Sequence, residues 1–226
     1  MTPERDSIRF TMSEAPPGYY YDHKRLEMLP FIPTTAKRIL DVGCGAGAFA
    51  SEVAKLVPAE FWGIELNAAT VARASPVFHR IITGDAKDKA GELPDRHFDC
   101  IICNDVLEHV IEPFALLEKL RAKLAPGGII VASVPNVRYV KNLYHLLAQK
   151  DWEYQDEGIR DRTHLRFFTR RSMTRSLTAA RWRIIRCQGI LPTRMRAAFA
   201  VLNALTLGSI ADTRFMNFAF VFTSAN

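Results

Sequence analysis

The residues best suited to chemistry form a glycine-rich turn followed by two well-spaced acids. The turn runs from Asp41 to Gly47, and its three glycines permit a tight backbone and the close approach of a ligand. The helix expected after this turn presents unpaired N–H groups to that ligand. Glu65 ends the next apolar segment, where a carboxylate can hold a ribose diol, and Asp85 ends a third, where it can accept from an adenine amino group. The pattern predicts a nucleotide-type cofactor.

The turn by itself leaves two cofactor classes open. Gly43, Gly45 and Ala48 also satisfy the dinucleotide fingerprint G-x-G-x-x-A, which is typical of nicotinamide cofactors. Three features argue against that class. Asp41 stands at the strand end, where its charge would repel a pyrophosphate, and Asp85 is a second acid at such a strand end. No hydride-transfer constellation follows in the sequence.

Strands and helices alternate around these residues. Short apolar segments predict strands, and apolar residues at helical spacing predict helices. The alternation indicates a parallel sheet in a three-layer α/β fold, whose ligand sites lie at the carboxyl ends of the strands. The predicted strands are 37–42, 61–66, 81–83, 98–104, 129–134, 182–187 and 214–223, and the predicted helices are 19–28, 48–57, 68–74, 112–124, 137–149, 172–180 and 192–208.

Five motifs, in this order, resemble those of the class I S-adenosylmethionine-dependent methyltransferases. They are ILDVGCGAG (39–47), WGIEL (62–66), GDA (84–86), FDCIICNDVLEHV (98–110) and LAPGGIIVASVPN (124–136). The resemblance implies a Rossmann-like three-layer sandwich with a seven-stranded, mostly parallel sheet and an antiparallel last strand. The cofactor it implies is S-adenosyl-L-methionine, with S-adenosyl-L-homocysteine as the product. An NAD(P)-dependent oxidoreductase and an inactive cofactor-binding scaffold are the alternatives.

By the same resemblance, the strand ends hold the cofactor. A cationic sulfonium and an ammonium group suit strand ends lined by acids and carbonyls. Asp85 or Asn104 capping a turn is the plainer alternative for those two side chains. The resemblance assigns Asp41 and Gly43 to the methionine part, Gly45 to a place beside the cofactor, Glu65 to the ribose, Asp85 and Ala86 to the adenine, and Asn104 to the sulfonium end. Leu66, next to Glu65, is a further expected cofactor residue. Tyr20 is expected to close over the cofactor, with a packed arm as the plainer alternative.

Two histidines near the predicted carboxyl edge are candidate catalytic residues. His109 follows the fourth strand, and His164 lies in the loop after the fifth. The stretch 161–169, DRTHLRFFT, resembles the signature of a bacterial methyltransferase subgroup associated with polysaccharide synthesis. A hydroxyl acceptor usually needs a base, and we assign that role to His164, with His109 as the second candidate. The plainer interpretations are that His164 pairs with Asp161 or a backbone carbonyl, and that His109 shapes its turn.

Cysteine and histidine spacing predicts neither a disulfide framework nor a metal site. Cys100 and Cys103 have C-x-x-C spacing, but positions three apart in a strand point to opposite faces. Cys44 in the glycine turn is expected to pack rather than to react. The histidines at positions 79, 97, 109 and 164 show no spacing typical of ligand pairs, so no metal is expected.

Positive charge is concentrated in the second half of the chain. The 226 residues carry a net charge of +6, yet window 160–196 alone contains eleven Arg and a single acid. This window surrounds the predicted acceptor loop and favours a small-molecule acceptor that is anionic or a carrier-linked sugar. Nucleic acid is disfavoured because the aromatic residues are not interleaved for base stacking. A solvated basic surface is the plainer alternative.

Composition and length indicate one folded domain with additions. Hydrophobic residues make up 48% and charged residues 24% of the chain, as in folded proteins of this size. We expect an N-terminal arm over the site at 1–36 and a methyltransferase domain at 37–226, with acceptor-site insertions at about 137–170 and 192–211. No apolar leader or run of about 20 apolar residues is evident, so the expected location is cytoplasmic, as a monomer or homodimer. Segment 192–211 is expected to pack on the sheet edge or on a second copy, or to contact a membrane surface.

The resemblance therefore implies an S-adenosylmethionine-dependent methyltransferase. The predicted reaction is O-methylation of a small-molecule or sugar hydroxyl by in-line methyl transfer, a reaction that depends mainly on aligning its two reactants.

Overall fold

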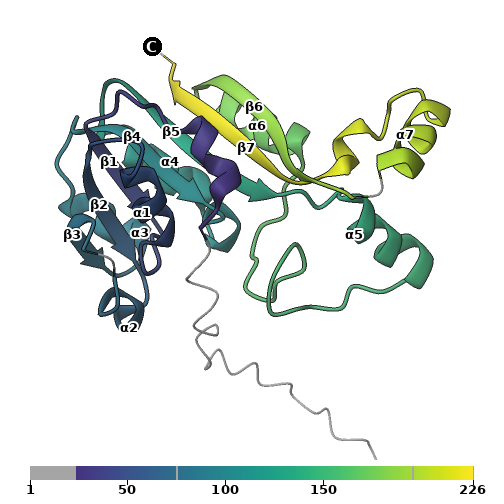
Figure 1. The fold of residues 1–226 in the computed structure, drawn as a ribbon, viewed down its shortest axis with the longest axis horizontal. Coiled ribbons are helices and arrows are strands. Elements are labelled where there is room, and N and C mark those ends of the chain that lie inside the picture. The colour runs from purple at the N-terminus through teal and green to yellow at the C-terminus, as the bar shows by residue number, and fades with distance from the viewer. Residues whose placement is uncertain (1–23, 75, 195, 226) are drawn as a thin grey trace, which may run out of the picture.

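The computed structural model describes residues 24–74, 76–194 and 196–225, which form a seven-stranded sheet with helices on both faces (Figure 1). The strands are β1 (Arg38–Val42), β2 (Glu60–Glu65), β3 (Phe78–Thr83), β4 (Phe98–Asn104), β5 (Leu124–Pro135), β6 (Trp182–Pro192) and β7 (Phe215–Ser224). The α-helices are α1 (Ala48–Ala54), α2 (Ala68–Val71), α3 (Ala86–Lys89), α4 (Pro113–Arg121), α5 (Val140–Tyr144), α6 (Arg170–Ala179) and α7 (Arg196–Leu205).

The strand order is β3-β2-β1-β4-β5-β7-β6. The strands from β3 to β5 pair in parallel, whereas β7 runs antiparallel to both of its neighbours. This is the mostly parallel, seven-stranded sheet with an antiparallel last strand that the family resemblance implies. Parallel pairing brings the carboxyl ends of β1, β2, β3 and β4 to one edge, where the predicted cofactor residues stand.

Both faces of the sheet are buried. In β1, Ile39 belongs to the apolar cluster that includes α1, and Leu40 belongs to the cluster that includes α4. In β4, Cys100 lies in the α1 cluster and Cys103 in the α4 cluster, so the two thiols occupy opposite faces. Burial raises the pKa of both thiols. The prediction that these two positions of the strand point to opposite faces is confirmed.

The segment before β1 differs from the expected helix at 19–28. Residues 1–23 lie outside the described residues, and the chain that follows forms a 3-10 helix at Leu26–Phe31. Pro30 lies inside this helix, because a short 3-10 turn tolerates the fixed backbone and missing N–H of proline. Met28 and Phe31 are buried in the α1 cluster and hold the segment against the sheet.

Several element boundaries also differ from the sequence-based expectations. β3 begins at Phe78 and β5 spans Leu124–Pro135, so both strands are longer than predicted. β6 continues to Pro192 because it pairs with β7 along that whole length, and the helix expected at 192–208 is confined to α7. Cross-strand pairing extends strands past the point where apolar alternation stops.

Two helical segments form a lobe beyond the sheet, which we call the α5–α7 lobe (residues 137–149 and 196–210). Figure 1 shows α5 and α7 on the same side of the molecule, past the ends of β6 and β7. A π-helical turn, His145–Gln149, continues α5. Leu147 in the first segment is 73% exposed and Leu205 in α7 is 76% exposed, so apolar side chains of both segments are only partly packed. Among the described residues, no helix is long and apolar enough to cross a membrane.

Candidate active site

The glycine turn after β1 has a backbone that other residues would strain. Gly43 has φ +69°, and a Cβ added there would lie 2.8 Å from a methyl group of Val106. The Gly43 and Cys44 amides both donate to the Ile64 carbonyl, at 2.8 and 3.2 Å. Gly47 also adopts a positive φ and leads directly into α1. The turn is therefore compact, and it is tied to the end of β2 as the sequence pattern requires.

Two carboxylates lie beside this turn. Asp41 is 3% exposed, and its pKa rises to about 8 because burial, and then the nearby Glu65 carboxylate, disfavour its charge. The Glu65 Oε2 atom accepts from the Gly45 amide at 2.9 Å, and its Oε1 atom accepts from the Asn67 amide at 2.9 Å. Each carboxylate oxygen can accept a further hydrogen bond, so Glu65 keeps capacity for a ligand hydroxyl.

The ends of β2 and β3 carry three further predicted cofactor residues. Leu66 follows β2 and is 70% exposed. Asp85 caps α3, with its Oδ1 atom accepting from the Lys87 amide at 2.8 Å, and Ala86 is the first residue of that helix. The capping interpretation of Asp85 is therefore correct for this structure. A capping carboxylate can still accept from a ligand, because only one of its oxygens is engaged by that bond.

Asn104, the last residue of β4, carries an unsatisfied amide. Its Oδ1 and Nδ2 atoms are shielded from solvent and have no hydrogen-bond partner among the described residues. A buried polar group without a partner costs about 1–3 kcal/mol, so such groups usually face a ligand or water. Together with the buried acid Asp41, this amide fits a polar, cationic ligand at the ends of β1 and β4.

Asp105 joins several elements immediately after β4, a role that the sequence analysis missed. It adopts a positive φ of 50°. Its Oδ1 atom accepts from the Ser133 hydroxyl at 2.7 Å and from the Asn217 amide nitrogen at 3.0 Å. Its second oxygen pairs with the guanidinium of Arg25. The chain just before the 3-10 helix is thereby fixed to the edge formed by the carboxyl ends of β4 and β5 and the amino end of β7.

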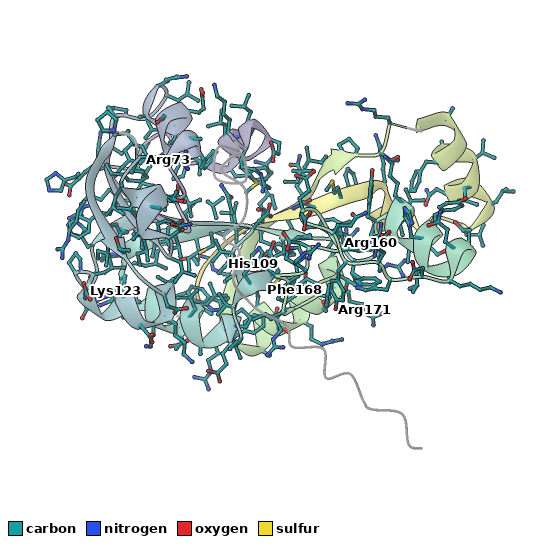
Figure 2. The ribbon with its side chains drawn as sticks, turned by 90° about the horizontal axis from the view of Figure 1, so that it is seen from below. Arg73, His109, Lys123, Arg160, Phe168 and Arg171 are labelled. Atoms are coloured by element: carbon teal, nitrogen blue, oxygen red, sulfur yellow. The ribbon has the colours of Figure 1, made fainter. Side chains whose placement is uncertain are left out.

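A second group of side chains gathers after Asp105. Glu108 is 1% exposed and His164 is 8% exposed, and the Glu108 Oε1 atom lies 4.0 Å from the His164 Nε2 atom. The rings of His109 and His164 meet edge to face with centroids 4.7 Å apart. Figure 2 shows His109 between the body of the sheet and the region of Arg160 and Phe168. The two histidines that the sequence analysis selects, 55 residues apart in the chain, therefore lie side by side.

Backbone and side-chain acceptors orient both rings. The His164 Nδ1 atom lies 3.1 Å from the Ile159 carbonyl, and the His109 Nδ1 atom lies 3.0 Å from the Thr163 hydroxyl. His164 thus contacts a backbone carbonyl, the plainer of the interpretations offered for it. Burial lowers the pKa of both imidazoles, to about 4 for His109. Burial raises the pKa of Glu108 to about 8.

Sequence reasoning found the histidines but missed the acid beside them. Glu108 immediately precedes His109 in the LEHV motif, and this adjacency was the available signal. The partner of these two residues, His164, is remote in sequence, so spacing alone could not reveal the group. Tyr20, the predicted cover over the cofactor, lies outside the described residues.

The fold is that of the class I S-adenosylmethionine-dependent methyltransferases. The sequence matches the methyltransferase-domain family over residues 13–186, and the chain belongs to that family. S-adenosyl-L-methionine is the cofactor of this class. The family match favours it over the nicotinamide cofactor that the glycine turn alone left open.

Known relatives support this assignment. The chain is 34% identical over 108 residues to the ubiquinone biosynthesis O-methyltransferase of Pseudomonas syringae pv. tomato, a match that covers 44% of this chain and 45% of that relative. The match thus spans less than half of the relative. A methyltransferase structure from Archaeoglobus fulgidus has a TM-score of 0.67 at 19% identity, covering 88% of this chain and 94% of that one. Phosphoethanolamine N-methyltransferase 2 of Haemonchus contortus, solved with S-adenosyl-L-methionine, has a TM-score of 0.60 at 15% identity, covering 94% of this chain and 54% of that one.

Proposed function

We propose that the protein transfers a methyl group from S-adenosyl-L-methionine to a hydroxyl oxygen of a small molecule. The observation that carries this proposal is the cluster of His109 with the buried Glu108 and His164 beside the end of β4. A hydroxyl is a weak nucleophile until it loses its proton, whereas a neutral amine needs less help. Imidazole and carboxylate groups close to the cofactor edge therefore suit a hydroxyl acceptor.

On the cofactor side, the proposal assigns binding to residues at the ends of β1, β2, β3 and β4. The bound cofactor supplies an electrophilic methyl group on a sulfonium. Asp41 offers a buried carboxylate to a cationic ligand, and the unsatisfied Asn104 amide offers a donor and an acceptor. The remaining proposed binding residues are Gly43, Gly45, Glu65, Leu66, Asp85, Ala86 and Tyr20.

For the acceptor, we propose that the arm at 1–36 covers the site and that the insertions at about 137–170 and 192–211 form the acceptor pocket. Arg25 supports the arm assignment, since it fixes the described end of the arm beside Asp105. Exposed leucines of the α5–α7 lobe, Leu147 and Leu205 among them, favour an acceptor with an apolar part, such as a lipid-linked molecule. The name of the Pseudomonas relative is consistent with a hydroxyl acceptor.

The arginine-rich window 160–196 is weaker support for a sugar or anionic acceptor than its net charge suggests, because several of its arginines make contacts within the protein. Arg160 is 6% exposed, and Arg162 pairs with Asp156 at 2.6 Å. Arg186 lies over the Phe31 ring at 4.3 Å, so it packs the 3-10 helix against β6. Part of the positive charge therefore stabilises the fold. A carrier-linked sugar remains the second candidate acceptor.

A transfer assay with tritium-labelled methyl donor tests this function. Phenolic, lipid-linked and sugar acceptors are offered together with matched analogues that lack the hydroxyl or carry an amine in its place. We expect label only on the hydroxyl-bearing members. Label on the amine analogues, or donor binding without transfer to any acceptor, would contradict O-methyl transfer, and the second result would favour a cofactor-binding scaffold.

A further inference from the structure

Glu108, His109 and His164 have the composition and spacing of a metal site. One potential ligand atom from each residue lies within 4.8 Å of those of the other two. Both carboxylate oxygens of Glu108 are buried without a hydrogen-bond partner among the described residues. A buried carboxylate without a donor or counter-charge is costly, so buried acids are normally paired or bound to a metal. A cation would supply the missing partner.

The hydrogen bonds of the two histidines fix which nitrogen carries the proton. His164 directs Nδ1 at the Ile159 carbonyl, which can only accept. The Thr163 hydroxyl lies 2.6 Å from the Asp161 carboxylate and donates its single proton there, so it accepts from Nδ1 of His109. Both neutral rings therefore carry hydrogen on Nδ1 and a lone pair on Nε2. Nε2 of His164 is the atom that faces Glu108.

These outer contacts match the way proteins hold metal-binding histidines. A ligating imidazole usually donates its second nitrogen to a backbone carbonyl, a carboxylate or a group bonded to one, which fixes ring orientation and tautomer. His164 uses the Ile159 carbonyl, and His109 uses the Asp161–Thr163 pair. Ligand atoms around one ion lie about 3 Å apart, whereas these atoms are separated by 4.0 Å between Glu108 and His164 and by up to 4.8 Å within the group, so the side chains need to close by about 1–2 Å.

We propose that Glu108, His109 and His164 bind a divalent transition-metal ion. Two imidazoles and one carboxylate, with no thiolate, suit ions such as Mn²⁺ and Zn²⁺ better than Mg²⁺, and three protein ligands leave coordination positions open. Its role rests on the proposed function: a Lewis acid at this position lowers the pKa of an acceptor hydroxyl. His164 and His109 then act as ligands in place of the direct base predicted from the sequence.

Titration of the tag-free, chelator-treated full chain with Mn²⁺ tests the site. Binding is measured by calorimetry and by the paramagnetic resonance signal of the ion. We expect one Mn²⁺ per chain, and displacement of Mn²⁺ by Zn²⁺. Glu108→Gln and His164→Gln are expected to weaken Mn²⁺ binding at least tenfold, whereas His79→Gln, at an exposed histidine outside the cluster, leaves it unchanged. His109 is partly exposed, so His109→Gln provides a third variant that disturbs the core less than the other two.

Binding of S-adenosylhomocysteine by each variant reports that the protein is folded, independently of the metal. The proposal is overturned if the wild-type chain binds neither Mn²⁺ nor Zn²⁺, or if folded Glu108 and His164 variants bind Mn²⁺ as tightly as the wild type. Metal binding without transfer to hydroxyl acceptors would contradict only the proposed function. Undiminished O-methylation by a chain that binds no metal would contradict only the metal site.

Discussion

The carboxylate of Glu65 at the end of β2 accepts a hydrogen bond of 2.9 Å from the backbone amide of Gly45 in the turn after β1. The acid predicted to hold the ribose and the turn predicted to lie beside the cofactor are therefore one unit. A change at Glu65 should alter both the shape of the turn and the binding of the cofactor.

Glu65→Gln tests this coupling. Glutamine has one acceptor oxygen, so it cannot accept from both the Gly45 and Asn67 amides while presenting an acceptor to a ligand diol. We expect the affinity for S-adenosylhomocysteine to fall at least tenfold, with a loss of about 1–2 kcal/mol in the free energy of unfolding. Calorimetry and urea denaturation measure the two effects. An unchanged affinity would show that Glu65 serves only the turn.

Asp41→Asn is expected to stabilise the free protein in a pH-dependent way. The pKa of Asp41 is about 8 in the folded chain, against an ordinary 3.8, because of burial and the Glu65 charge. Between these values the folded state holds a proton that the unfolded chain has released, so this group makes stability fall as pH rises. The variant lacks that group. Its melting temperature should exceed that of the wild type by a margin that grows between about pH 5 and pH 8.

The matched control for this experiment is Asp88→Asn, at an exposed position on α3. We expect its melting temperature to follow that of the wild type across the same pH range. The variant at position 41 should in addition bind S-adenosylhomocysteine more weakly, since it loses the charge offered to the ligand. A margin that shrinks as pH rises would refute the raised pKa.

Arg25→Met tests the link between the arm and the carboxyl edge. The Arg25 side chain is 16% exposed and pairs with Asp105, which also accepts from Ser133. We expect a loss of about 1–2 kcal/mol in the free energy of unfolding, because the partly buried Asp105 loses its counter-charge. Lys24→Met, which removes a surface pair with Glu52, should cost less than about 1 kcal/mol. Equal urea midpoints for the two variants would argue against the link.

Gly189→Ala tests the packing of β6 on β7. A Cβ at position 189 would lie 2.2 Å from the Phe215 ring, so the ring or the strand must move. We expect destabilisation by about 1–3 kcal/mol, as for other overpacked sites. Gly91→Ala is the matched control, because nothing lies within 4 Å of its added Cβ. Thermal unfolding measures the stability of both variants. Similar melting temperatures would contradict the tight contact between position 189 and the Phe215 ring.

The sheet, and the placement of three acids at one edge of it, could be predicted because their signals are local. Each strand is a short apolar run, and the acids Asp41, Glu65 and Asp85 stand at strand ends within a few residues of those runs. Parallel pairing then brings the ends together without further information. The opposite faces of Cys100 and Cys103 followed from the two-residue period of a strand alone.

The remaining features depend on contacts between distant segments. Glu108 and His164 meet only because the loop after β5 returns to the end of β4, where Leu165 and Arg166 donate to the Glu108 carbonyl. Asp105 joins Arg25, Ser133 and Asn217 from three separate parts of the chain. The end of β6 is likewise set by its pairing with β7. No local pattern encodes such pairings, so the sequence could supply candidates but not the arrangement.

The central claim, a site for S-adenosyl-L-methionine at the carboxyl ends of β1, β2, β3 and β4, is tested most directly by calorimetric titration of the full chain with S-adenosylhomocysteine and, separately, with NAD. The account predicts saturable binding of one S-adenosylhomocysteine per chain, weakened by Asp41→Asn and Glu65→Gln, and no binding of NAD. Tight binding of NAD together with no binding of S-adenosylhomocysteine would contradict it.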